Sequence, residues 1–157
     1  MRLFQILFLS WLTTLLPAQE VVIKAQGGGD LKIGANSYQF TLEAFYTAPP
    51  KGGLPGAVKF SGLLSAKDGS APFHMDLSVL KNGTLYMLTI QRRNGRSYPD
   101  SWNATQKTKT RFLKLEDRPG GRFELRCEGM LTGVISQKPA QANWSGTLWA
   151  VQPGSQN

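Results

Sequence analysis

The sequence predicts an all-β protein, built as a single antiparallel β-sandwich or as a closed or partly open β-barrel of about eight hairpin-linked strands. Three observations support this prediction. Apolar residues recur at every second position, turn-forming residues separate these runs, and the 157 residues include 17 Gly and 9 Pro. Beyond the N-terminus, no segment of useful length has the periodicity of a helix.

The N-terminus has the layout of a secretory signal peptide. Arg2 gives a positive start, residues 3–16 are mostly apolar, and Pro17-Ala18 precedes a polar stretch. Because a membrane span needs ~20 apolar residues, we expect cleavage after Ala18, and an uncleaved anchor is the alternative. The expected parts are a signal peptide (1–18), a single all-β domain (19–152) and a polar C-terminal tail (153–157). The mature protein is then secreted or periplasmic.

In the first half of the domain, residues 21–25 are the expected first strand, which Gly27-Gly28-Gly29 closes. Residues 38–46 alternate and place on one face Tyr38, Phe40, Leu42, Ala44 and Tyr46. Proline and glycine break the sheet over 48–56, and the alternation resumes over 58–66 and 73–79. Asn82-Gly83 then separates 73–79 from 85–91, which predicts a hairpin because both residues tolerate positive φ.

In the second half, residues 97–106 read as a loop that holds Tyr98, Pro99 and Trp102. Strands are expected over 108–115, 123–135 and 143–151, with turns over 117–121 and 137–142. The run 123–135 carries apolar residues on one face and Arg122, Glu124, Arg126 and Glu128 on the other. Its glycines, Gly129 and Gly133, predict a bend or bulge where the sheet curls toward closure.

The single cysteine, Cys127, excludes an internal disulfide bond. It alternates in phase with Phe123 and Leu125, so we expect a buried, inert thiol that packs as a small core residue. An intermolecular bridge is the alternative.

The sequence gives no positive sign of catalysis. His74, Asp76 and Ser78 are the residue types of a hydrolytic triad on one strand face. Same-face neighbours lie ~6.7 Å apart and point in parallel directions, whereas triad side chains converge. One His and one Cys do not make a zinc site, and the carboxylates are not clustered as calcium requires. We therefore predict no catalytic residue, no metal and no cofactor.

Positive charge is concentrated in one stretch. Without the signal, 17 Lys and Arg face 10 Asp and Glu, and residues 92–114 hold seven of these cations and one acid, Asp100. Such a patch attracts polyanions, and aromatic side chains among the cations can stack on sugars or bases. The predicted anion- or surface-binding residues are Arg92, Arg93, Arg96, Tyr98, Trp102, Lys107, Lys109 and Arg111. A solvated strand face is the alternative.

These observations favour an exported, non-catalytic module that binds a ligand or a surface, with an anionic lipid, glycan or cell-surface polymer as the expected partner. No specific nucleic acid is predicted. The alternative function is a structural or assembly protein that associates through its sheet edges, and an enzyme without recognisable motifs ranks below both. An outer-membrane barrel would need an outward apolar band, whereas Lys109, Arg111 and Arg126 fall at mid-strand, so we expect no membrane-spanning protein.

Overall fold

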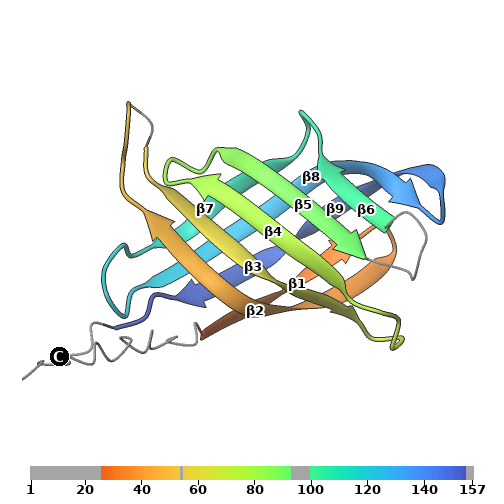
Figure 1. Cartoon of the computed structure of the whole chain (residues 1–157), viewed down its shortest axis with the longest axis horizontal. Helices are drawn as coiled ribbons and strands as arrows, with labels where there is room; N and C mark the ends of the chain where they lie inside the picture. Colours follow the sequence, from red (N-terminus) through yellow and green to blue (C-terminus); the bar gives the residue numbers. More distant parts are fainter. Residues whose placement is uncertain (1–25, 54, 93–99, 155–157) are drawn as a thin grey trace, which may run out of the picture.

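The computed structural model describes residues 26–53, 55–92 and 100–154, and it confirms the all-β prediction. Nine antiparallel strands form one sheet (Figure 1). They are β1 (Gln26–Ile33), β2 (Asn36–Ala48), β3 (Ala57–Ala66), β4 (Phe73–Leu80), β5 (Leu85–Arg92), β6 (Asp100–Ala104), β7 (Lys109–Leu115), β8 (Arg122–Ile135) and β9 (Lys138–Val151). No helix in the described ranges is long and apolar enough to cross a bilayer.

The sheet closes on itself as a barrel. The strand order is β6-β5-β4-β3-β2-β1-β9-β8-β7, and β6 also pairs with β8. Eight strands therefore form a closed ring, in which β2 to β5 cross the front in Figure 1, and β7 is an additional strand. Of the two predicted architectures, the structure has the barrel.

β6 and β7 follow each other along the same edge of β8. The first half of β8 pairs with β7, and Leu131 to Val134 pair with β6. Gly129 lies at the change of partner with a φ of 123°, where a Cβ atom would stand 2.0 Å from the Lys107 carbonyl oxygen. The hydroxyls of Thr105 and Thr108 both donate to the Met130 carbonyl, at 2.8 and 2.6 Å. β6 and β7 thus behave as one interrupted strand along β8, and side-chain hydrogen bonds stabilise the turn between them.

The interior is filled with apolar side chains from every strand of the ring. Phe45 of β2 lies 5.3 Å from Phe60 and 5.0 Å from Phe123 of β8, between ring centroids. β2 and β8 are not neighbours in the sheet, so the second contact crosses the interior. The core includes Leu31, Phe40, Val58, Leu64, Met75, Leu77, Ile90, Trp102, Leu125, Cys127, Leu131, Trp144 and Leu148.

A β-bulge corrects the predicted faces of β2. Residues 38–42 alternate as expected, but the register shifts between Leu42 and Ala44, with Glu43 as the extra residue. After the bulge Phe45 points inward, and Tyr46 is 60% exposed. The prediction that Ala44 and Tyr46 share the face of Tyr38, Phe40 and Leu42 is therefore wrong, because one inserted residue reverses the faces of all that follow.

Two predicted turns are also wrong. Gly27-Gly28-Gly29 lies inside β1 and does not close an earlier strand, and the expected strand at 21–25 is outside the described residues. Glycine is required there because a Cβ at Gly29 would stand 2.2 Å from the Thr147 carbonyl oxygen of β9. The predicted turn at 137–142 is instead a two-residue turn at Ser136 and Gln137, with φ of 49° and 63°, after which β9 begins at once. The hairpin at Asn82-Gly83 is confirmed, with Gly83 at a φ of 90°.

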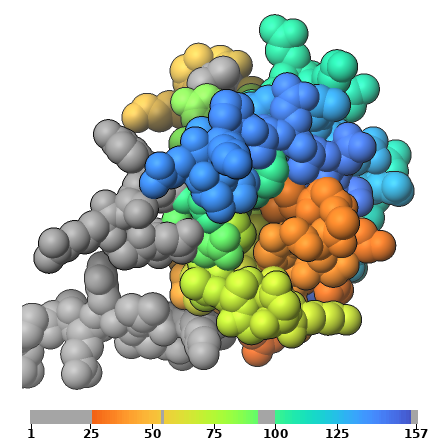
Figure 2. Space-filling view, turned by 90° about the vertical axis from the view of Figure 1, so that its right-hand side faces the viewer, coloured from red at the N-terminus to blue at the C-terminus, as the bar shows by residue number. Residues whose placement is uncertain are grey.

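An ion pair between partly exposed Arg92 and buried Asp100 joins the strands where the ring closes. Arg92 lies opposite Asp100 where β5 pairs with β6, and its guanidinium donates to the Asp100 carboxylate at 2.7 Å. The other carboxylate oxygen accepts the Ser136 N–H at 2.7 Å. Asp100 thereby ties β5 and β6 to the β8–β9 turn, at the end of the barrel that faces the viewer in Figure 2.

Replacing Asp100 tests this closure. Asp100→Asn should lower the free energy of unfolding by about 3 kcal/mol, because it leaves the largely buried Arg92 without its counter-charge. Urea denaturation measures the change. Glu128→Gln is the matched control, since its ion pair with Arg126 is more than half exposed and should contribute less than about 0.5 kcal/mol. Equal losses in the two variants would contradict the closing role of Asp100.

The thiol of Cys127 is fully buried, as the sequence predicts. Burial raises the pKa of this thiol far above its ordinary value, which suppresses the reactive thiolate. We therefore expect the native protein to resist an aromatic disulfide reagent at pH 8 and to react fully in denaturant. Rapid modification of the folded protein, followed by absorbance, would contradict the buried position.

Candidate functional site

The structure separates the predicted basic residues. Arg93, Arg96 and Tyr98 lie outside the described residues. Arg92 is engaged in the barrel: besides Asp100, its guanidinium donates to the Ala71 carbonyl at 3.3 Å and lies 4.5 Å from the centre of the Phe73 ring. Lys109 pairs with Glu128 of β8, whereas Ser101, next to Asp100, pairs with Val134, which is six residues further along β8 and roughly 20 Å away at the rise of a β-strand. Arg92 therefore does not share a surface with the cations of β7.

Trp102 is a core residue, and the prediction that it lies in a loop is wrong. Asp100–Ala104 is the strand β6, and Trp102 is 8% exposed between Ile90 and Gly133. The sequence hides this strand because it is short and begins with a charged residue. Asp100 can nevertheless be buried, since its carboxylate has partners on β5 and in the β8–β9 turn.

The cations of β7 project outward together, as predicted. Lys109 and Arg111 are exposed, and β7 pairs with β8 so that Arg111 lies opposite Arg126 and Lys109 opposite Glu128. Lys107 is also exposed, but it lies in the turn before β7 and not on the strand, where the alternation had placed it. Lys109, Thr110, Arg111, Arg126 and Glu128 line a recess of about 540 Å³. We call Lys109, Arg111 and Arg126 the basic face. Sequence reasoning missed Arg126 as a member, although the turn at 117–121 already implied that β7 and β8 pair.

The charges of the basic face are only partly neutralised. Arg126 contacts Glu128 at 3.5 Å, but the nearby acids Glu124 and Glu116 are paired with Arg122 and Lys114 at 2.6 and 3.1 Å. The backbone N–H of Arg122 and the Lys114 ammonium hold the pKa of Glu116 below its ordinary value. The Glu116 carboxylate therefore stays ionised in its pair with Lys114. Within the described residues, Lys109 and Arg111 form no ion pair. Like charges at directly opposite positions are unfavourable, so Arg111 and Arg126 favour a bound anion.

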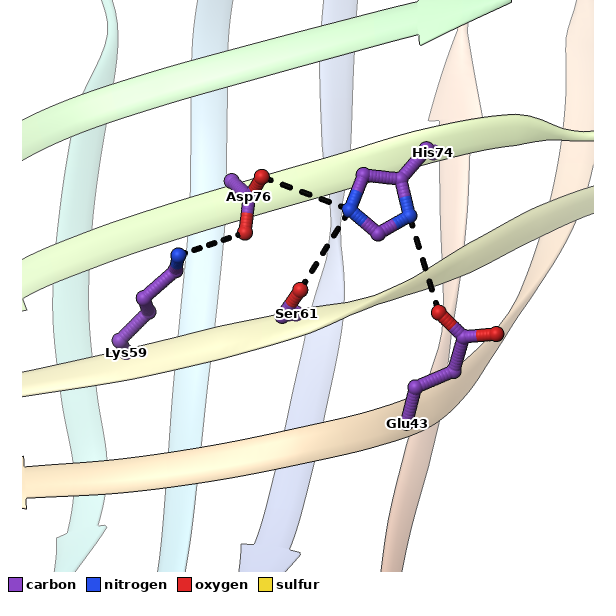
Figure 3. Close-up of polar contacts among 5 residues, drawn as sticks. All are labelled: Glu43, Lys59, Ser61, His74 and Asp76. Carbon is purple, nitrogen blue, oxygen red and sulfur yellow. Dashed lines mark hydrogen bonds and ion pairs between the residues drawn. The ribbon is translucent and has the colours of Figure 1, made fainter.

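A second polar cluster lies on the outer face of β2, β3 and β4 (Figure 3). The imidazole of His74 lies between two carboxylates: its Nδ1 is 3.7 Å from Glu43 Oε2, and its Nε2 is 3.4 Å from Asp76 Oδ2. Ser61 Oγ is 3.5 Å from the same Nε2, and Lys59 Nζ pairs with Asp76 at 2.9 Å. These contacts come from adjacent strands and from the bulge at Glu43, which single-strand reasoning on His74, Asp76 and Ser78 could not reveal.

The geometry of this cluster favours a charge network. Ser61, His74 and Glu43 stand in the order of a hydrolytic triad, but Asp76 competes with Ser61 for the same ring nitrogen. Ser61 also lies in a strand paired on both sides, so the sheet uses the backbone amides from which an oxyanion hole would be built. In the described part of the chain, no three ligating side chains are placed to hold a metal ion. We interpret the cluster as polar contacts that join β2, β3 and β4.

The network makes stability depend on pH through Asp76. Burial raises the pKa of Asp76, but the Lys59 ammonium and the Ser61 hydroxyl outweigh burial and hold it below the ordinary value. The stabilisation is therefore present at neutral pH and is lost as the pH falls below about 4 through the depressed pKa. Asp76→Asn should cost about 1 kcal/mol at pH 7, and the difference from the wild type should shrink in acid. Urea denaturation across this range measures it, and a difference independent of pH would contradict the assignment.

Comparisons of the chain with protein-family models, curated proteins and solved structures find no match. The charge, shape and chemistry of the surface therefore carry the functional proposal.

Proposed function

We propose that this chain is an exported, non-catalytic β-barrel that binds an anionic polymer or surface through the basic face. The observation that carries the proposal is the pair Arg111 and Arg126, held directly opposite each other beside an unpaired Lys109. Like charges at directly opposite positions of two strands are destabilising, whereas opposite charges there are stabilising. A bound sulfate, phosphate or carboxylate group reverses the sign of the interaction.

The filled interior supports binding on the outside of the barrel. Side chains from non-adjacent strands meet across the core, as Phe45 and Phe123 do. A recess on the outer wall is open to a long polymer, which could not enter such a core. The signal-like N-terminus supports export, and an exported protein meets anionic lipids, glycans and cell-surface polymers.

The alternative, assembly through sheet edges, has less support. β7 pairs with β8 on one side only, but the β4–β5 turn lies against it: Thr110 Oγ1 donates to the Gly83 carbonyl at 2.8 Å, and Lys81 pairs with Asp117 just beyond β7. A partner strand would have to displace these contacts. Additional strands on β7 would also approach the cations Lys109 and Arg111, which form no ion pair among the described residues.

Removing three charges from the basic face tests the proposal. We expect the variant K109S/R111S/R126S to bind an anionic polymer, such as polyphosphate or a polyuronate, about 10- to 100-fold more weakly, since each exposed charge contact contributes ~0.5–1 kcal/mol. The binding of the wild-type protein should weaken as salt is added, and that of the variant should depend less on salt. Fluorescence anisotropy with a labelled polymer measures both.

The matched control removes three cations elsewhere. Lys51, Arg118 and Lys138 are exposed and lie outside the basic face, so K51S/R118S/K138S has the same net charge as the test variant. It should bind the polymer nearly as the wild type does. Equal loss in both variants would show attraction by net charge alone and would contradict a site on β7 and β8.

A further inference from the structure

The outer wall continues from the basic face into a polar groove. A single row of exposed residues crosses six neighbouring strands: Arg111, Arg126, Thr147, Asp30, Gln39 and Ser65. At ~4.8 Å between strands, this row is about 24 Å long. Its first two members are arginines, and the remainder are side chains whose oxygens and amide group suit hydroxyl partners.

Two recesses lie along this row and share Asp30 and Gln39. The first, of about 640 Å³, extends between β9, β1, β2 and β3 and includes Ser37, Ser65 and Ser145. The second, of about 560 Å³, includes Thr41, Thr147 and Trp149. We call the two recesses together the polar groove. Lys32 and Lys67 line the first recess and outnumber the carboxylate of Asp30, so the groove does not repel an anionic chain.

An aromatic side chain stands over a glycine in the second recess. Trp149 of β9 is partly exposed and lies opposite Gly28 of β1, where a Cβ atom would come within 3.9 Å of the indole nitrogen. The absence of a side chain at Gly28 helps to form the recess between Trp149 and Thr41. The Arg122 guanidinium lies 4.7 Å from the Trp149 ring centre and fixes the indole at the border of β8. An indole beside hydroxyl and amide groups is suited to the apolar faces and hydroxyls of a sugar ring.

We propose that the anionic partner is an acidic polysaccharide, whose sugar rings lie in the polar groove and whose carboxylate or sulfate groups contact the basic face. This inference rests on the proposed function and narrows its partner class. Arg111, Arg126 and Lys109 are complementary in charge to an anion, and the row of Thr147, Asp30 and Gln39 offers hydrogen-bond partners to hydroxyl groups of the same molecule. A lipid surface or polyphosphate matches the charge only.

The test compares four probes by titration calorimetry with the purified chain: a polyuronate oligosaccharide, an uncharged glucan oligosaccharide, polyphosphate, and vesicles that contain phosphatidylglycerol. The wild type should bind the polyuronate best. Trp149→Ala and Gln39→Ala should each weaken polyuronate binding about tenfold and leave polyphosphate binding unchanged. Gln39 is exposed, so Gln39→Ala keeps the test decisive if Trp149→Ala does not fold.

Matched controls lie outside the groove, at the other end of β2 and on β5. Tyr46 is 60% exposed and Gln91 is exposed on β5, so Tyr46→Ala and Gln91→Ala remove the same kinds of side chain outside the groove and should not change polyuronate binding. Unchanged polyuronate binding in both groove variants would overturn the inference. Polyphosphate or vesicles bound as tightly as the polyuronate would overturn it too, while the proposed function would stand. Failure to bind any of the three anionic probes would overturn both.

Discussion

The barrel depends on the contact between Arg92 and Asp100. Six of the ring's eight strand pairings join strands of eight residues or more, but the wall between β5 and β8 rests on the five-residue strand β6. Asp100 begins that strand and is buried, so its charge must have partners. These partners are the Arg92 guanidinium at the end of β5 and the backbone N–H of Ser136 in the β8–β9 turn. The ion pair itself adds little to the free energy of folding, because the cost of desolvating the two charges offsets their attraction. Its contribution is to determine that the end of β5 meets the start of β6 and the β8–β9 turn.

Closure at β6 also creates the outer surface on which the proposed function relies. β8 is longer than β6, so its first half projects past the ring closure and accepts β7 as an additional strand. Gly129, Thr105 and Thr108 make the transition without leaving the Met130 carbonyl unpaired. β7 is therefore placed beside β8, and Arg111 meets Arg126. The basic face follows from the way in which the barrel closes.

The sequence predicts the parts of this protein that depend on local patterning. Alternation placed Phe73, Leu125 and Cys127 in the core, and Asn82-Gly83 marked a hairpin, because side-chain direction in a strand and φ in a turn are local properties. The predicted faces of Ala44 and Tyr46 are wrong because a bulge leaves no mark in the composition. Arg126 and the polar groove required the register between strands, which the alternation does not encode.

The distribution of charge along the sequence also differs from its distribution on the surface, because strand pairing decides which charged residues are neighbours. Arg92 belongs to the densest basic stretch, yet its guanidinium is used on Asp100, Ala71 and Phe73 at the end of the barrel. Arg126 belongs to an alternating ladder that looks balanced along one strand, yet the neighbouring strand adds Arg111 and removes the balance. Pairing of β1 with β9 likewise brings Gly28 next to Thr147 and Trp149, which are distant in the chain, so that the three line one recess. In an antiparallel barrel, the residues that are neighbours on the outer surface come from different strands. They can therefore be identified only when the pairing and register of the strands are known.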